Sequence, residues 1–417
     1  LQPEAAHDLT LRLSALPGAA GIIRAIAGAP VDDPVTLMGL RFANRVGLAA
    51  GLDKNARYID ALAASGFGFL EVGTVTPKPQ PGNAKPRMFR LAQQRAVINR
   101  FGFNNDGLDE FLRNVGRRRF AGVLGLNIGK NAVTPNDRAI EDYRLGLRRC
   151  HPVASYITVN ISSPNTSDLR ALQHDQALSD MLDALTAERA ACESDGQRHV
   201  PLLLKIAPDL SHDQIQQIAG QVVAHGFDGV IATNTTIDKS QVAASPHAGE
   251  AGGLSGAPLL QRSNEVIAGL RACLPPGFPI IGVGGIMSPC SHPPIGSHRL
   301  AMGTELQGRG KTAVTHDGLE RCNPGAPVNG VAGWVIAQQR GGRLAGLTLG
   351  QVCRKHFRPV APGQMTRFIE GYGQRKGLGL PWFVKGPTRG VQIERWAQSA
   401  VSVCAHAALR YDCQQST

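Results

Sequence analysis

Residues 156–166 carry the side chains whose chemistry is easiest to interpret in this 417-residue chain. The apolar run YITV ends in NISSPNT, and Pro164 stops any continuation of a strand. A buried strand ends in this way when it delivers polar side chains to the mouth of a barrel or open sheet. Amides and hydroxyls without formal charge suit a planar, hydrogen-bonding ligand such as a flavin ring or a pyrimidine. The alternative is an ordinary Asn/Ser/Pro turn.

Six other short apolar runs end in polar or Gly-rich sequence. Lys205 lies inside such a run, where a solvated surface charge is not expected. Gly284 and Gly285 resemble half of a phosphate site built from backbone N–H groups, and 252–256 is a second Gly-rich loop. These endings hold no carboxylate pair, clustered His or metal-spaced ligands, which disfavours hydrolysis and metal chemistry. The endings are AAGLDK from Ala49, EVGTVTP from Glu71, LNIGKN from Leu126, LLKIAPD from Leu203, TNTT from Thr233 and GVGGI from Gly282.

The segment 99–105, NRFGFNN, combines amides with two aromatic rings. One interpretation is a turn, which such polar residues favour. The other is a lid over a planar substrate. The sequence leaves both open.

Short apolar strands alternate with helical patterns from residue 46 to residue 283. This alternation predicts right-handed βαβ units and a parallel sheet, and seven strands approach the eight of a TIM (β/α)8 barrel. A doubly wound α/β sheet is the alternative. The predicted strands are 46–50, 69–72, 123–127, 156–161, 202–206, 230–233 and 280–283. The predicted helices are 58–65, 106–115, 140–149, 176–191, 212–225 and 262–274.

Residues 1–30 predict one or two amphipathic helices, broken at Pro17-Gly18. One interpretation is a helical cap packed on the domain. The other is a small apolar patch that touches a membrane surface or admits a lipophilic molecule. The predicted organisation is therefore an N-terminal helical segment at 1–30, a barrel at 31–287 and a tail at 288–417.

The tail differs from the rest of the chain in charge, in cysteine content and in periodicity. Residues 288–417 hold 16 Lys and Arg against 6 Asp and Glu, so they carry +10 of the net charge of +12. Five of the eight cysteines lie there, and its apolar runs have no consistent period. A segment of this size without structure is not expected inside a compact domain. The tail is therefore expected to be disordered, out-of-frame or otherwise foreign to the barrel.

Composition excludes several functional classes. The body is nearly neutral, so the basic stripe that nucleic-acid binding requires is missing, and no nucleic-acid partner is expected. No CxxC pair occurs, which disfavours a zinc site, and the cysteines are expected to be reduced. The sequence contains no run of 18 or more apolar residues, so it predicts no membrane span.

The ordered motifs resemble the dihydroorotate dehydrogenase family, and within it the membrane-associated, quinone-using class. The resemblance covers about residues 3–286 and includes nine motifs in order. They are AAGLDK, EVGTVTPKPQPGN, NRFGFNN, GLNIGKN, VNISSPNT, LKIAPDL, IATNTT, GGLSG and IIGVGGI. The implied activity is oxidation of dihydroorotate to orotate with FMN in pyrimidine biosynthesis, with electrons passed to a quinone. A peripheral position on the cytoplasmic side of the cell membrane is also implied.

The resemblance assigns roles to individual residues. Ser163 is implied as the catalytic base that removes a proton from C5 of dihydroorotate while hydride passes from C6 to the flavin. No metal is implied. The implied FMN-binding residues are Ala50, Gly51, Leu52, Asp53, Lys54, Thr74, Asn127, Asn160, Lys205, Thr233, Gly256 and Gly285. The implied substrate-binding residues are Lys54, Asn99, Arg100, Phe101, Gly102, Phe103, Asn160, Asn165, Asn234 and Thr235.

The base also indicates the class, because soluble relatives use Cys where this chain has Ser163. Serine is a weak base at its free pKa and normally needs activation. No His lies nearby in sequence, so a bound water or a neighbouring Thr hydroxyl is expected to relay the proton.

The sequence departs from the family after Ile286. The helix, and the eighth strand that completes the phosphate site, are not recognisable there, so the eighth strand is expected to be missing or replaced by the tail. A barrel with two open edges should fold poorly or bind FMN weakly. Two alternative functions follow: an inactive product of a damaged gene, or another FMN-dependent pyrimidine oxidoreductase that uses a nicotinamide cofactor. No GxGxxG unit supports the latter.

Overall fold

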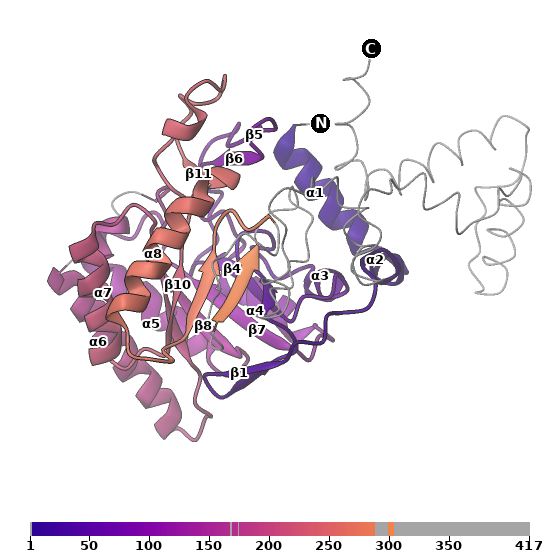
Figure 1. The fold of residues 1–417 in the computed structure, drawn as a ribbon. Helices are drawn as coiled ribbons and strands as arrows, with labels where there is room; N and C mark the ends of the chain where they lie inside the picture. The colour runs from indigo at the N-terminus through magenta and orange to yellow at the C-terminus, as the bar shows by residue number, and fades with distance from the viewer. Residues whose placement is uncertain (1, 167–168, 174, 288–298, 304–417) are drawn as a thin grey trace, which may run out of the picture. The chain divides into compact units, whose positions relative to one another are not determined.

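Eight parallel strands close a barrel in the computed structural model, which describes residues 2–166, 169–173, 175–287 and 299–303 (Figure 1). The order around the barrel follows the chain, and every neighbouring pair is parallel. The TIM barrel predicted from the alternation is confirmed. The strands are β3 (Val46–Leu48), β4 (Phe69–Val75), β7 (Val123–Ile128), β8 (Tyr156–Asn160), β9 (Leu202–Ile206), β10 (Gly229–Ala232), β12 (Ile280–Val283) and β13 (Arg299–Gly303).

Helices cover the outside of the barrel, each close to its predicted position (Figure 1). Their apolar faces pack against outward-facing strand residues; Phe111 and Leu147, for example, belong to the same buried cluster as Leu126. The helix that follows β9 begins at a capping box made by Ser211 and Gln214. The helices are α3 (Ile59–Ala63), α4 (Gly107–Gly116), α5 (Ala139–Cys150), α6 (Asp175–Ser194), α7 (His212–Ala224) and α8 (Leu260–Cys273).

The eighth strand comes from the segment predicted to be the tail. Arg299–Gly303 pairs in parallel with β12 on one side and with β3 on the other. The barrel therefore extends past the predicted boundary at residue 287, and the two open edges expected from the sequence are paired along these registers. The sequence signal was weak because this strand has five residues and no helical pattern precedes it. The rest of the predicted tail, 288–298 and 304–417, lies outside the described residues.

The barrel strands alternate between two buried clusters. In β8, Ile157 and Val159 point outward to the helices, whereas Tyr156 points into the barrel. The period of two places Thr158 and Asn160 on the same inner face as Tyr156. The same alternation turns Glu71, Asn127 and Lys205 inward from β4, β7 and β9. The barrel interior is therefore polar toward the carboxyl ends of the strands, although every one of these side chains is buried.

An apolar plug closes the amino-terminal end of the barrel. The hairpin β1 (Val35–Leu37) and β2 (Leu40–Phe42) packs Phe42 against Phe69, with ring centroids 5.1 Å apart in an edge-to-face arrangement. Both rings belong to a cluster with inward residues of the barrel strands, such as Leu203. The sequence prediction did not include this hairpin.

A small antiparallel sheet lies at the other end, built from β5 (Met88–Leu91), β6 (Ala96–Asn99) and β11 (Gly253–Gly256). In its register Asn99 lies opposite Gly253. The sheet therefore brings the segment that follows Asn99 beside the Gly-rich loop that follows β10. It also supports the first helix of the chain, α1 (Pro3–Ser14), which contacts β5 (Figure 1).

The N-terminal segment forms two helices as predicted, α1 and α2 (Ala19–Ala27). Glu4 of α1 pairs with Arg87 at 2.8 Å and with Lys85 at 3.2 Å, which fixes this helix beside the small sheet. Along the described part of the chain, no single helix has the length and hydropathy of a membrane span. The pair α1 and α2, bent by 102°, meets those two criteria only when taken together.

We expect Phe42→Ala to lower the free energy of unfolding by about 3–5 kcal/mol, because it removes a fully buried ring from the plug and leaves a cavity. Val133→Ala is the control, since Val133 is 85% exposed and its truncation should change stability by less than about 0.5 kcal/mol. Urea unfolding measures both. A loss below about 1 kcal/mol for Phe42→Ala would show that the hairpin does not plug the barrel.

Candidate active site

The carboxyl ends of β4, β7 and β8 are joined by a buried chain of hydrogen bonds. Thr74 donates from Oγ1 to Asn127 Oδ1 at 2.6 Å, and Asn160 donates from Nδ2 to Thr74 Oγ1 at 3.0 Å. All three were predicted to lie at one site, and parallel strands bring them there because their carboxyl ends share one end of the barrel. They form a rigid polar surface without formal charge.

Glu71 anchors this chain from inside the barrel. Its carboxylate accepts hydrogen bonds from Asn127 Nδ2 at 2.8 Å, Thr158 Oγ1 at 3.0 Å and the Tyr156 hydroxyl at 3.1 Å. Gly125 makes the last contact possible, since a Cβ there would lie 2.1 Å from the Tyr156 ring. Burial and the neighbouring charge of Glu71 raise the pKa of Tyr156 well above its usual range, so this hydroxyl stays protonated and donates.

Lys205 enters the same interior from β9. It lies opposite Asn160 in the strand register and is buried. Burial lowers the pKa of Lys205, while the charge of Glu71 opposes that shift. Lys205 was predicted to be functional because it lies in an apolar run. The buried carboxylate of Glu71 supplies the opposite charge that a buried lysine needs there.

Two pairs of asparagines, from three segments of the chain, lie at the carboxyl ends of the strands. Asn234, after β10, donates from Nδ2 to Asn160 Oδ1 at 3.3 Å and to Ser162 Oγ at 2.9 Å. Asn165 donates from Nδ2 to Asn99 Oδ1 at 3.3 Å. The predicted substrate residues of the β6, β8 and β10 ends are thus brought together. Amides of this kind can each donate and accept, as recognition of a flat ring with alternating C=O and N–H groups requires.

The two adjacent serines differ in what their hydroxyls contact. Ser162 is fully buried and donates to Asn160 Oδ1 at 3.1 Å while accepting from Asn234. Ser163 Oγ accepts only from the backbone N–H of Asn165, at 3.2 Å, among the described residues. The hydroxyl hydrogen of Ser163 is therefore not committed to the amide network, which suits a proton-transfer group.

The segment after Ser163 is tied to the neighbouring strand ends by Arg170. Its guanidinium donates to the carbonyl oxygens of Ser162 at 3.1 Å and Thr235 at 2.8 Å, and pairs with Asp209 at 2.6 Å. Thr235, a predicted substrate residue, also donates its backbone N–H to Asn234 Oδ1 at 2.8 Å. The β8, β9 and β10 ends are thus held as one unit.

Lys54 approaches the site from the loop after β3. Its Nζ donates to Gly51 O at 2.8 Å and lies 4.1 Å from the centre of the Phe101 ring. Burial, and after it the charge of Arg87, lower the pKa of Lys54 to about 8. The side chain remains largely charged at neutral pH and becomes neutral as the pH rises through about 8.

His7 of α1 lies close enough to Lys54 to sense its charge. Burial, and then the charge of Lys54, lower the pKa of His7 to about 4, although Asp8 and Glu4 oppose the shift. The imidazole is therefore neutral at physiological pH. Helix α1 therefore lies near the Lys54 side of the barrel mouth.

Glycines surround the amino-terminal end of α8. Gly256 and Gly285 have positive φ angles of 98° and 68°, and Gly284 has 122°. A Cβ on Gly285 would lie 2.6 Å from Leu260 N, so only glycine permits this close approach to the helix start. Positive-φ glycines beside a helix N-terminus expose backbone N–H groups, which is how proteins bind phosphate. Beside them, Thr233 shares a hydrogen bond of 3.1 Å with Ser263 Oγ.

Some predicted residues have other tasks. Arg100 pairs with Glu250 at 2.7 Å, so its guanidinium is directed toward the Gly-rich loop and not to the amides. Asp53 accepts from the backbone N–H groups of Arg57 and Tyr58, so its carboxylate holds the loop after β3, where burial raises its pKa. Ala50 and Leu52 are buried in the same loop.

The loop 99–105, for which the sequence allows either a turn or a lid, is held by hydrogen bonds. Gln80 donates from Nε2 to the carbonyl oxygens of Gly102 and Phe103, at 2.9 and 3.2 Å. Phe103 is buried and has a φ of 54°, and its ring lies near Thr74 across Gly129. In this structure the loop forms a wall beside the amides.

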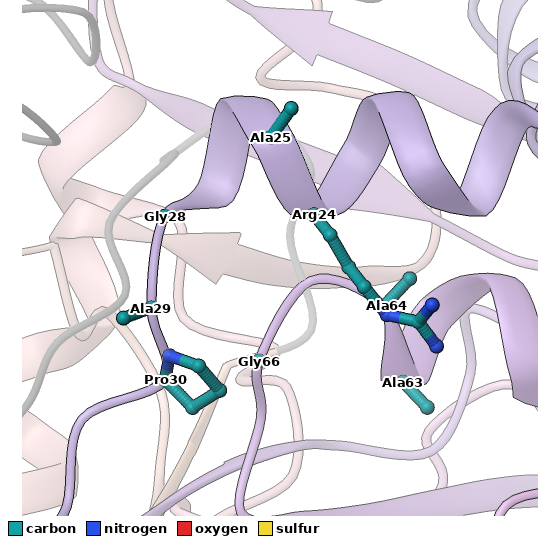
Figure 2. A pocket seen from close by; sticks show the side chains of 8 residues that line it. All are labelled: Arg24, Ala25, Gly28, Ala29, Pro30, Ala63, Ala64 and Gly66. Atoms are coloured by element: carbon teal, nitrogen blue, oxygen red, sulfur yellow. The ribbon is translucent and has the colours of Figure 1, made fainter.

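A separate pocket of about 490 Å³ lies between α2 and α3. Figure 2 shows the Arg24 side chain extending from α2 toward Ala64, and small apolar residues form most of the remaining wall. Gly66 of its lining precedes β4, so the pocket faces the amino ends of the strands. Since catalytic residues of these barrels lie at the carboxyl ends, this pocket is not the candidate active site.

Sequence reasoning missed two contributors. Glu71 stands in a strand-end motif without an assigned role, although a carboxylate inside an apolar strand is a usable signal. His7 carries no signal, because its position beside Lys54 depends on the packing of α1. Among the residues that the structure describes, no group of three His, Cys, Asp or Glu side chains could hold a metal ion.

Comparisons with known proteins agree on one family. A family model described as dihydroorotate dehydrogenase matches residues 34–316, beyond the last motif at Ile286. The dihydroorotate dehydrogenase (quinone) of Delftia acidovorans is 56% identical over 293 residues, covering 69% of this chain and 84% of the relative. That of Acidovorax ebreus is 57% identical over 296 residues, with coverage of 69% and 84%. The ligand-free dihydroorotate dehydrogenase of Eimeria tenella aligns with a TM-score of 0.63 at 34% identity, covering 81% of this chain and 96% of that structure.

The fold is a (β/α)8 barrel with buried amides and lysines at its strand ends, and the family model and relatives make it an oxidoreductase. The matched family model covers well over half of the chain, and the named relatives share more than half of the aligned residues with it. This chain belongs to the dihydroorotate dehydrogenase family, in its quinone-dependent class.

We expect His7→Gln to make folding stability less sensitive to acid. The unfolded chain protonates His7 near pH 6.5 but the folded chain only near pH 4, so stability is lost as the pH falls through this window. Between pH 6.5 and 4 the variant should lose roughly 1–3 kcal/mol less than the wild type. Urea unfolding at a series of pH values measures the difference. His212→Gln at the exposed start of α7 is the control, and equal acid sensitivity of wild type and His7→Gln would contradict the prediction.

Proposed function

We propose that this protein oxidises dihydroorotate to orotate with bound FMN and passes the electrons to a quinone. The observation that carries the proposal is the pairing of Asn99 with Asn165 and of Asn160 with Asn234, on either side of the uncommitted hydroxyl of Ser163 in the β8 segment. A pyrimidine ring with amide-like edges can pair with such amides, and the base of the reaction must lie beside them. The Delftia and Acidovorax relatives, both dihydroorotate dehydrogenases (quinone), support the same activity.

The residues present fit FMN. The positive-φ glycines at the start of α8 suit its phosphate, because N–H groups and the helix dipole favour an anion there. Thr74, Asn127 and Asn160 offer a polar edge for the ring system. Lys205 would stabilise negative charge on the reduced ring. When bound, FMN supplies the hydride acceptor for the reaction.

Ser163 would remove the C5 proton of dihydroorotate. Its Oγ receives the backbone N–H of Asn165, which orients the lone pairs, while its own hydrogen can be passed onward. Thr166 lies three residues further on, and its buried hydroxyl has no hydrogen-bond partner among the described residues. A relay from Ser163 through this hydroxyl, directly or through water, would deliver the proton to solvent. Lys54 adds positive charge that favours an anionic carboxylate on the substrate.

The N-terminal helices would receive the quinone at a membrane surface. Leu9 of α1, Leu16 between the helices, and Ile22 and Ile26 of α2 are large apolar side chains exposed to solvent. An exposed apolar patch of this kind suits a lipid surface or a lipophilic molecule. His7 of α1 lies near Lys54, so the helices that carry the patch also border the Lys54 side of the site. We infer a peripheral position on the cytoplasmic face of the cell membrane.

We expect Ser163→Ala to slow flavin reduction by dihydroorotate at least about 10²-fold, a typical loss for removal of a general base. Anaerobic stopped-flow absorbance of the flavin measures this step directly. Ser65→Ala, in the turn after α3, is the control and should leave the rate unchanged. Near-normal reduction by Ser163→Ala would remove Ser163 from its proposed role.

We expect the purified full chain to be yellow and to transfer electrons from dihydroorotate to a water-soluble quinone analogue. It should not transfer them to NAD⁺, because the sequence holds no dinucleotide-binding fingerprint. Flavin absorbance gives the FMN content, and dye-coupled and NADH assays give the acceptor. A colourless protein that takes up no added FMN would favour the inactive gene product, and NADH formation would favour the nicotinamide-dependent alternative.

A further inference from the structure

The buried hydrogen bonds of the site form one directional series that starts at Glu71. Asn127 donates to Glu71, Thr74 donates to Asn127, and Asn160 donates to Thr74. Asn234 then donates to Asn160 at 3.3 Å. Each side chain donates a hydrogen bond to the member nearer Glu71 and accepts one from the next member.

Glu71 and the backbone determine this direction. A carboxylate only accepts, so it requires the NH2 end of the Asn127 amide, and the Asn127 oxygen must then face Thr74. Thr74 uses its single hydrogen there and is left to accept from Asn160. At the far end, the backbone N–H of Thr235 donates to Asn234 Oδ1 at 2.8 Å, and a backbone N–H cannot reverse.

We propose that Glu71 is a positioning residue that sets the donor and acceptor directions of Asn127 and Thr74. Together with the backbone N–H groups at the far end, it thereby holds Asn160 and Asn234 in the orientation that recognises the pyrimidine ring. This inference rests on the proposed function. Glu71 is fully buried beneath Asn127, so it acts on the ligand through this series without touching it. A pyrimidine would then meet amides that cannot turn to the wrong orientation.

A glutamine at this position weakens the constraint in a defined way. It has one oxygen for three donors, and turning that oxygen to Tyr156 and Thr158 keeps two hydrogen bonds at the expense of one. Its NH2 group then faces the NH2 group of Asn127 and favours reversal of that amide. Reversal turns the Asn127 NH2 group toward Thr74, which already accepts from Asn160 and loses the acceptor for its own hydrogen. Turning Asn160 to provide that acceptor conflicts with the backbone N–H of Ser162 that Asn160 Oδ1 accepts, so the series is strained at Asn160.

The test compares Glu71→Gln with Tyr156→Phe by calorimetric titration with orotate, in protein held in excess FMN. Both variants remove part of the same buried cluster, and both should melt at lower temperature than the wild type. Only Glu71→Gln should weaken orotate binding, by at least about tenfold, which corresponds to one misdirected hydrogen bond. Tyr156→Phe keeps the acceptor-only carboxylate and should bind orotate within about twofold of the wild type.

A compensating double variant tests the direction itself. In Glu71→Gln combined with Asn127→Asp, the new carboxylate accepts both from the NH2 group of the introduced glutamine and from Thr74. The series beyond residue 127 therefore regains its direction. Orotate affinity within about threefold of the wild type is expected, even where Glu71→Gln alone does not fold. A double variant that folds yet binds orotate no better than about tenfold below the wild type would overturn the proposal.

The outcomes separate this inference from the proposed function. Wild-type affinity for orotate in Glu71→Gln, or an equal loss in Tyr156→Phe, would overturn the role of Glu71 alone. A wild-type protein that binds neither FMN nor orotate would overturn the proposed function and the inference with it.

Discussion

The active-site end of the barrel depends on a carboxylate that is removed entirely from water. Glu71 has no exposed surface, and burying such a group is costly unless hydrogen bonds and an opposite charge compensate it. Three donors and the nearby charge of Lys205 provide that compensation. The polar interior is therefore a cooperative unit, since removing one member weakens the hydrogen bonding of its buried neighbours.

The rest of the fold allows this unit to exist. Closure of the ladder by Arg299–Gly303 satisfies backbone groups that an open edge would expose, although the segment comes from sequence that looked foreign to the barrel. The Phe42 plug keeps water from the amino-terminal end. Gly125 leaves room for the Tyr156 ring to reach Glu71. The apolar packing at the amino-terminal end of the barrel thus supports the polar network at the carboxyl ends of its strands.

The site is divided between a fixed interior and a surface assembled from loops. Thr74, Asn127 and Asn160 lie on strands, whereas Asn99, Asn165 and Asn234 lie at or beyond strand ends and are held by side-chain contacts such as those of Arg170. Strand residues give precise positions, and loop residues complete the enclosure. The N-terminal helices form a third part, connected to the site through Glu4 and His7.

The sequence by itself determined the barrel, most of its strand and helix positions and the identity of the polar strand ends, because hydrophobic period and turn chemistry are local properties. It also distinguished Ser163 through a family motif. Tertiary structure alone decided that Arg299–Gly303 closes the sheet, that Arg100 turns to Glu250, and that Glu71 directs the amides. These features depend on which distant segments meet, and contacts between residues tens of positions apart leave no periodic signal in the chain.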